Sequence, residues 1–107
     1  MDLQKLNEAL PPALQQANVS CRAFWKDDNG MYVSSTSLYL GKLKIATFFY
    51  DGSISKGDVK KYKVTSPVKG IRDYLGHFET EEEAVAMCYR VANTFLSMLS
   101  HGSQRSH

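Results

Sequence analysis

The chain has 107 residues, with 13 lysines and arginines against 11 aspartates and glutamates, a formal net charge of +2 and 43% hydrophobic residues. This length suits a single domain spanning the whole chain, and the composition excludes wholesale disorder. No apolar run approaches the roughly 18 residues of a membrane span, and no basic start followed by an apolar block indicates a signal peptide. We therefore expect a cytoplasmic protein that does not enter a membrane and whose two cysteines are reduced.

The charge is distributed unevenly along the chain. Residues 42–72 contain eight basic residues against Asp51 and Asp58, a net charge of +6. The remainder contains five basic against nine acidic residues, a net charge of −4. Such a separation is typical of proteins that bind polyanions.

A broken amphipathic helix is expected over residues 1–18. Leu6 and Leu10 recur at helical spacing, and the two prolines that follow, Pro11 and Pro12, interrupt the helix because proline has no amide proton to donate. The segment is predicted to lie across the core.

Residues 21–78 are expected to form three to five antiparallel strands. Cys21, Ala23 and Trp25 alternate with polar or outward residues and are predicted to point inward. A turn is predicted over 27–30, with the return strand beginning at 31–33.

The run from Leu38 to Tyr50 is the most strand-like of the chain. Simple alternation divides it into two faces, one with Lys42, Lys44, Ala46, Phe48 and Tyr50 and the other with Leu43, Ile45, Thr47 and Phe49. Lys61 and Lys63 are expected on the first of these faces if the next strand pairs with it.

A long helix is predicted over residues 80–100. Thr80 and Glu83 form a capping box, and the acidic first turn suits the helix dipole. An apolar stripe continues along it through Ala84, Met87, Cys88, Val91, Phe95 and Leu99, with Met98 beside them. Gly102 is expected to end the helix and to leave residues 101–107 as a flexible tail.

The order of helix, strands and helix predicts an α+β fold. We expect an antiparallel sheet of three to five strands packed against the long C-terminal helix, with the short broken N-terminal helix beside it. Both helices would cover one face of the sheet, and the other face would be open to solvent or a partner.

An enzyme is not expected. Cys21 and Cys88 are read as buried apolar side chains, although a pair between Cys88 and His77 stays open as an alternative. His101 and His107 lie in or beside the tail. No metal-binding spacing and no phosphate-binding glycine loop occurs, so no metal or other cofactor is predicted.

The basic and aromatic residues of the strands carry the functional hypothesis, a non-enzymatic nucleic-acid-binding module that recognises charge or shape rather than base sequence. The candidate binding residues are Lys42, Lys44, Phe48, Tyr50, Lys56, Lys60, Lys61, Lys63, Lys69 and Arg72. The alternative is that these lysines only solvate the sheet and discourage edge-to-edge association.

Residues 74–89 resemble the segment that joins the last strand to the helix in plant ethylene-response-factor DNA-binding domains and their phage integrase relatives. The resemblance implies a three-stranded antiparallel sheet on one helix, with packing roles for Leu75, Phe78 and Ala84. It covers under a fifth of the chain, and the strands that contact bases in that family have no clear counterpart here. The element order is also similar to that of double-stranded-RNA-binding domains, but the acidic start of the helix argues against them.

Two further readings involve protein partners. In the first, the chain is a small phage or mobile-element protein that binds and inhibits a host nucleic-acid enzyme, with exposed aromatic residues as interface anchors. In the second, it forms a homodimer through the open sheet face or its edge.

Overall fold

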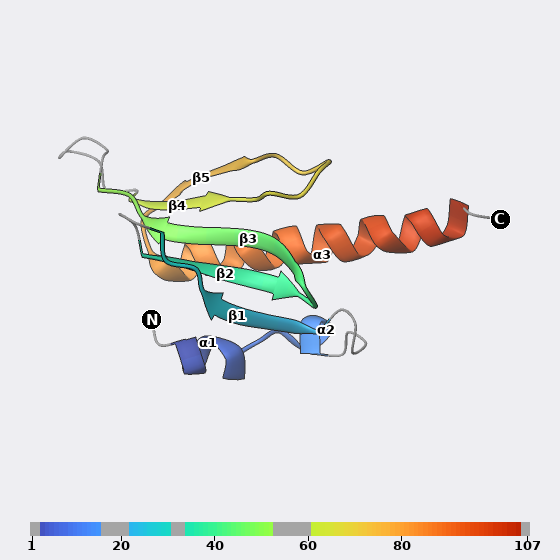
Figure 1. Ribbon diagram of the computed structural model, residues 1–107, viewed down its shortest axis with the longest axis horizontal. Coiled ribbons are helices and arrows are strands. Elements are labelled where there is room, and N and C mark those ends of the chain that lie inside the picture. Colours follow the sequence, from blue (N-terminus) through green and yellow to red (C-terminus); the bar gives the residue numbers. More distant parts are fainter. Residues whose placement is uncertain (1–2, 16–21, 31–33, 53–60, 106–107) are drawn as a thin grey trace.

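The computed structural model describes residues 3–15, 22–30, 34–52 and 61–105. In chain order the elements are α1 (Leu3–Glu8), α2 (Pro12–Gln15), β1 (Ala23–Asp27), β2 (Ser35–Leu40), β3 (Leu43–Tyr50), β4 (Tyr62–Thr65), β5 (Tyr74–Phe78) and α3 (Glu81–Arg105). The strands form one five-stranded antiparallel sheet in the order β1 to β5, and α3 passes behind it (Figure 1). The predicted α+β class is confirmed.

The strand-like run from Leu38 to Tyr50 is divided between two strands. A tight turn at Gly41 and Lys42 separates β2 from β3, and Gly41 has a φ of 63°, a left-handed conformation that glycine adopts without strain. β2 begins at Ser35, within a polar stretch that made it hard to recognise. The strand start predicted at 31–33 lies outside the described residues.

A bulge between β2 and β3 places Lys44 on the opposite face from Ala46, Phe48 and Tyr50, with which alternation grouped it. Leu38 pairs with Ala46 while Tyr39 pairs with Lys44, so Ile45 is an extra residue in β3. Ile45 and Ala46 are both fully buried, and beyond them Phe48 faces the core. The prediction that Lys44, Phe48 and Tyr50 share a face is therefore wrong.

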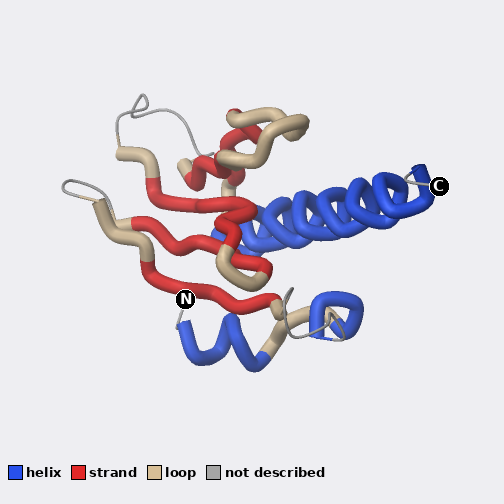
Figure 2. Tube along the Cα trace, turned by 45° about the vertical axis from the view of Figure 1, so that its right-hand side comes forward, coloured by secondary structure: helices blue, strands red, loops and turns tan. Residues whose placement is uncertain are grey.

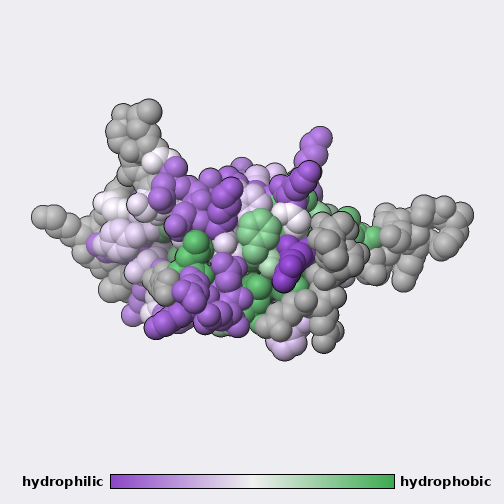
Figure 3. All heavy atoms as spheres, turned by 60° about the horizontal axis from the view of Figure 1, so that its bottom comes forward, coloured by the Kyte–Doolittle hydropathy of each residue, from purple (hydrophilic) through white to green (hydrophobic). Residues whose placement is uncertain are grey.

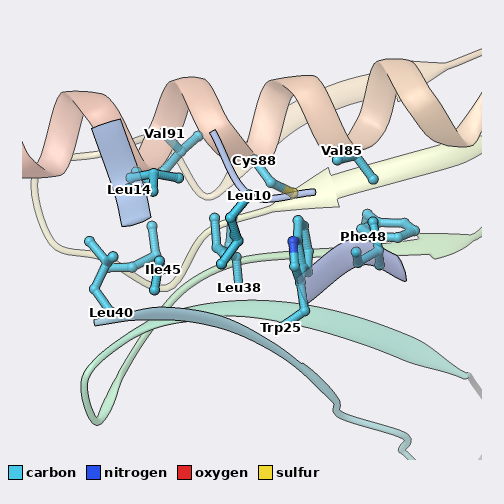
Figure 4. Close-up of a cluster of buried hydrophobic side chains, with 14 of the residues drawn as sticks. Leu10, Leu14, Trp25, Leu38, Leu40, Ile45, Phe48, Val85, Cys88 and Val91 are labelled. Carbon is cyan, nitrogen blue, oxygen red and sulfur yellow. The ribbon is translucent and has the colours of Figure 1, made fainter. Parts of the chain in front are cut away.

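The core lies between the sheet and α3. Trp25 from β1 is 2% exposed and makes edge-to-face contacts with Phe48 and Tyr89, at centroid distances of 5.6 and 5.7 Å. Figure 4 shows Leu38 and Ile45 from the sheet pointing toward Cys88 and Val91 on α3. The inward orientation predicted for Ala23 and Trp25 is confirmed, whereas Cys21 lies outside the described residues.

α1 closes the edge of the sheet beside β1 (Figure 2), and α2 packs against α3. The break at Pro11 and Pro12 is as predicted, and Leu6, Leu10 and Leu14 are buried in the core. The segment covers the β1 edge as well as contributing to the core, because α1 packs mainly against β1.

α3 begins with the predicted capping box. The Glu83 amide donates to Thr80 Oγ1 at 3.2 Å, and the Thr80 amide donates to Glu83 Oε1 at 3.3 Å. The helix continues to Arg105, so the predicted end at Gly102 is wrong. A single glycine does not end the helix, because it lowers helix stability by only about 1 kcal/mol. Its last turns project past the strands (Figure 1), which leaves Met98 and Leu99 exposed at the end of the apolar stripe.

Candidate functional site

The face of the sheet opposite α3, here called the outer face, carries aromatic, basic and hydroxyl side chains. Strand pairing assigns residues to it, since directly paired residues share a face. Its members on the strands are Phe24, Lys26, Ser35, Ser37, Tyr39, Lys44, Thr47, Phe49, Lys63, Thr65, Tyr74 and His77.

Lys63 lies between two aromatic rings at the β3–β5 side of the outer face. Its Nζ is 5.9 Å from the centroid of Phe49 and 5.7 Å from that of Tyr74. Both contacts are within the range in which a cation is attracted to an aromatic face. The ammonium group is therefore held above the sheet by the two rings.

His77 connects Tyr74 to the end of β3. Its Nε2 is 2.9 Å from Asp51 Oδ2, and its Nδ1 is 2.7 Å from the Tyr74 hydroxyl. Because a carboxylate can only accept, Nε2 donates to Asp51, and a neutral His77 then accepts from Tyr74 through Nδ1. This chain of contacts fixes the position of the Tyr74 ring.

An ion pair crosses the centre of the outer face. The Lys44 ammonium donates to Asp28, which also accepts from Ser37 Oγ at 3.0 Å, and Ser37 Oγ is 2.7 Å from Thr47 Oγ1. The hydrogen bonds from Lys44 and then from Ser37 hold the pKa of Asp28 below its ordinary value, and the bond to Asp28 raises the pKa of Lys44. Ser37 is fully buried beneath this group although it belongs to the outer face.

A stacked pair of rings occupies the β1–β2 side of the outer face. Phe24 and Tyr39 lie with centroids 5.3 Å apart and an interplanar angle of 8°. On the side of the molecule that carries α1 and β1, apolar residues form small patches separated by polar residues (Figure 3). On the outer face itself, lysine, serine and threonine side chains of the strands lie between the aromatic residues.

The predicted binding residues are only partly brought together. Lys44 and Lys63 lie on the outer face, with Lys61 two residues before Lys63 and hydrogen-bonded through its carbonyl to Asp51. Phe48 is 4% exposed in the core, and Tyr50 is on the helix side, edge-on to Tyr62. Lys42, Lys69 and Arg72 are exposed in turns or loops, and Lys56 and Lys60 lie outside the described residues.

The sequence reading missed the aromatic residues that the outer face does carry. These are Phe24, Tyr39, Phe49 and Tyr74, together with His77 and its partner Asp51. Alternation in β1 does place Phe24 opposite Trp25, but the bulge in β3 concealed that Phe49 shares a face with Lys44.

The structure contradicts a catalytic pair between Cys88 and His77. Cys88 is buried on α3, while His77 lies on the opposite face of the sheet.

A hollow of about 360 Å³ beside β5 is lined by Arg72, Tyr74, Leu75, Gly76 and Met87. Across the part of the chain that the structure describes, no group of three potential ligands is placed to hold a metal ion. Among the same residues, no helix is long and apolar enough to cross a membrane.

Cys88 is expected to be inert in the folded protein. Burial raises the pKa of its thiol to about 12, so at pH 8 only about one thiol in ten thousand is the reactive thiolate. In a Cys21→Ser variant, a chromogenic disulfide reagent should leave Cys88 unmodified under native conditions and modify it fully in denaturant. Modification of the native protein at the rate of a free cysteine would contradict this expectation.

The comparisons with known proteins found no match to this chain among protein-family models, curated proteins or solved structures.

Proposed function

We propose that this protein binds nucleic acid through the outer face and does so without catalysis. The observation that supports the proposal best is the Lys63 ammonium held between Phe49 and Tyr74 on an open sheet face. A cation beside the exposed ring of Tyr74 offers phosphate attraction and base contact in the same place.

The charge of the outer face favours a polyanion. Lys26, Lys44, Lys61 and Lys63 are present against Asp28 and Asp51. The acidic residues Glu81, Glu82 and Glu83 lie in the first turn of α3, in the other layer. A polyanion would therefore be attracted to the sheet layer in preference to the helix layer.

The lysines favour contact with the phosphate backbone over reading of base sequence. A lysine ammonium is a compact charge on a flexible stem, whereas bidentate recognition of base edges is typical of arginine. No arginine occurs among the strand residues of the outer face. The affinity is expected to fall steeply as salt is added, because bound phosphates release counterions.

Two double variants with equal loss of charge test the proposal. Fluorescence anisotropy with single- and double-stranded DNA and RNA, at low and moderate salt, should detect binding by the wild-type protein. Lys61→Gln with Lys63→Gln should weaken binding and lower the salt slope by about 1.4–1.8, one phosphate contact per lysine. Lys5→Gln with Arg90→Gln removes the same charge from the exposed surfaces of α1 and α3 and should have a much smaller effect.

Absence of binding to every nucleic acid at low salt would refute the proposal. Equal losses in the two double variants would refute the assignment of the outer face, since net charge alone would then account for the binding.

A protein partner is the second candidate, because Tyr74 and Phe24 are exposed aromatic residues of the kind that anchor interfaces. Two results together would support a protein partner. No nucleic acid would bind, and the wild-type protein, but not Tyr74→Ala, would retain a host protein in stoichiometric amount. Retention by both proteins would exclude the outer face as that interface.

A further inference from the structure

We infer that the ligand of the outer face is a single-stranded nucleic acid whose unpaired bases stack on Tyr74 at one side and on the Phe24–Tyr39 pair at the other. This assignment rests on the proposed function and names its substrate class. It follows from the width of the sheet, the exposure of the rings and their separation.

The sheet is too wide to enter a groove of duplex DNA. Neighbouring strands are about 4.8 Å apart, so the centres of β1 and β5 are about 19 Å apart across the five-stranded sheet. The major groove is about 12 Å wide and admits a helix or a two-stranded ribbon. A duplex could therefore touch the outer face only through its phosphates, and the aromatic rings would have nothing to stack on.

The rings are positioned to receive bases that are not paired. Tyr74 is 53% exposed, and its hydroxyl is held by His77 while Lys63 lies against its ring. Because the hydroxyl and one contact of the ring are fixed within the protein, the ring is oriented before a ligand arrives. A stacked base would then lie beside the Lys63 ammonium, which attracts the phosphate next to it.

The two aromatic sites are far enough apart to take separate bases. Through the pairs Tyr74–Thr65, Thr65–Thr47 and Thr47–Ser37, Tyr74 lies level with Ser37, two residues along β2 from Tyr39. β2 and β5 are three strand spacings apart, about 14 Å across the sheet. The Lys44–Asp28 pair lies between the sites, so the intervening phosphates would pass over a lysine.

The proposal is tested with strands that differ only in their bases. The probes are an oligothymidylate of about 15 nucleotides, an abasic strand with the same number of phosphates, and a duplex of equal length. The oligothymidylate should bind more tightly than the abasic strand by at least about 5- to 150-fold, the range of stacking on one ring, because the abasic strand loses stacking at both sites. An oligouridylate forms a parallel arm, and the tighter of the two strands identifies DNA or RNA as the ligand.

Substitutions of two equally exposed tyrosines separate the faces of the sheet. Tyr74→Ala should lower affinity for the oligothymidylate about 5- to 150-fold and leave affinity for the abasic strand and the salt slope unchanged. Tyr74→Phe keeps the ring and should bind nearly as wild type. Tyr50→Ala, at a residue 56% exposed on the helix side of β3, should also bind as wild type.

The outcomes distinguish this inference from the proposed function. Equal binding of abasic and base-bearing strands, tighter binding of the duplex, or equal losses in Tyr74→Ala and Tyr50→Ala would overturn the inference while leaving nucleic-acid binding in place. No binding of any probe would overturn both.

Discussion

Replacing Trp25 with alanine is expected to lower the free energy of unfolding by about 3–5 kcal/mol. The indole is 2% exposed, contacts Phe48 and Tyr89 edge to face, and donates from Nε1 to the Tyr89 hydroxyl at 3.1 Å. Its removal leaves a cavity at the centre of the sheet–helix interface. Urea denaturation followed by circular dichroism measures the loss, because Trp25 is the single tryptophan and its fluorescence disappears with it.

Two milder variants divide this effect into packing and hydrogen bonding. Trp25→Phe keeps an aromatic ring, so its free energy of unfolding should fall less than that of the alanine variant. It can therefore be measured even if Trp25→Ala does not fold. Tyr89→Phe removes the acceptor of the indole and should lose about 1 kcal/mol. A loss of less than 1 kcal/mol for Trp25→Ala would show that the indole does not fill the core as described.

Asn7→Ala is expected to destabilise the protein by about 1–3 kcal/mol by opening the β1 edge. The Asn7 amide group pairs with the strand backbone at one residue, donating to the Trp25 carbonyl at 3.1 Å and accepting from the Trp25 amide at 2.6 Å. It thereby replaces the hydrogen bonds of a further strand. Without it, the edge is available to another chain, which favours association.

Urea denaturation and size-exclusion chromatography measure the two consequences of Asn7→Ala. Glu8→Ala, in the same helix but at an exposed site, is the control and should change stability by no more than about 0.5 kcal/mol. Asn7→Asp keeps the acceptor but sets a carboxylate oxygen against the Trp25 carbonyl, so a loss at least as large as that of Asn7→Ala is expected. Equal stability of Asn7→Ala and Glu8→Ala would refute the role of the amide at the sheet edge.

The elements that the sequence predicted well depend on interactions between near neighbours. The break in the N-terminal helix follows from the missing amide protons of Pro11 and Pro12. The start of α3 follows from the reciprocal bonds of Thr80 and Glu83, which are three residues apart. Alternation in β4 separates Lys63 from its neighbours in sequence, and the structure places Lys63 on the outer face opposite Phe49.

The candidate binding face was predicted in part. Lys44 and Lys63 were correctly expected to share a face, but Phe48 and Tyr50 were wrongly placed with them. Simple alternation counts β3 as a regular strand and has no means of detecting the extra residue, Ile45. His77 was considered only as a partner for Cys88, because its contact with Asp51 joins β5 to the end of β3, 26 residues away in the sequence.

The sequence alone determined the uneven charge along the chain, which is +6 over residues 42–72 and −4 elsewhere. It also determined the α+β class, because composition, caps and strand periodicity are local properties. Only the tertiary structure decided which rings accompany the lysines. Ile45 and Ala46 are adjacent yet both buried against the helix layer, and the bulge that accommodates them turns Phe49 outward and Phe48 inward. The composition of the outer face therefore depends on how β2, β3 and α3 pack together, which no single segment of the chain specifies.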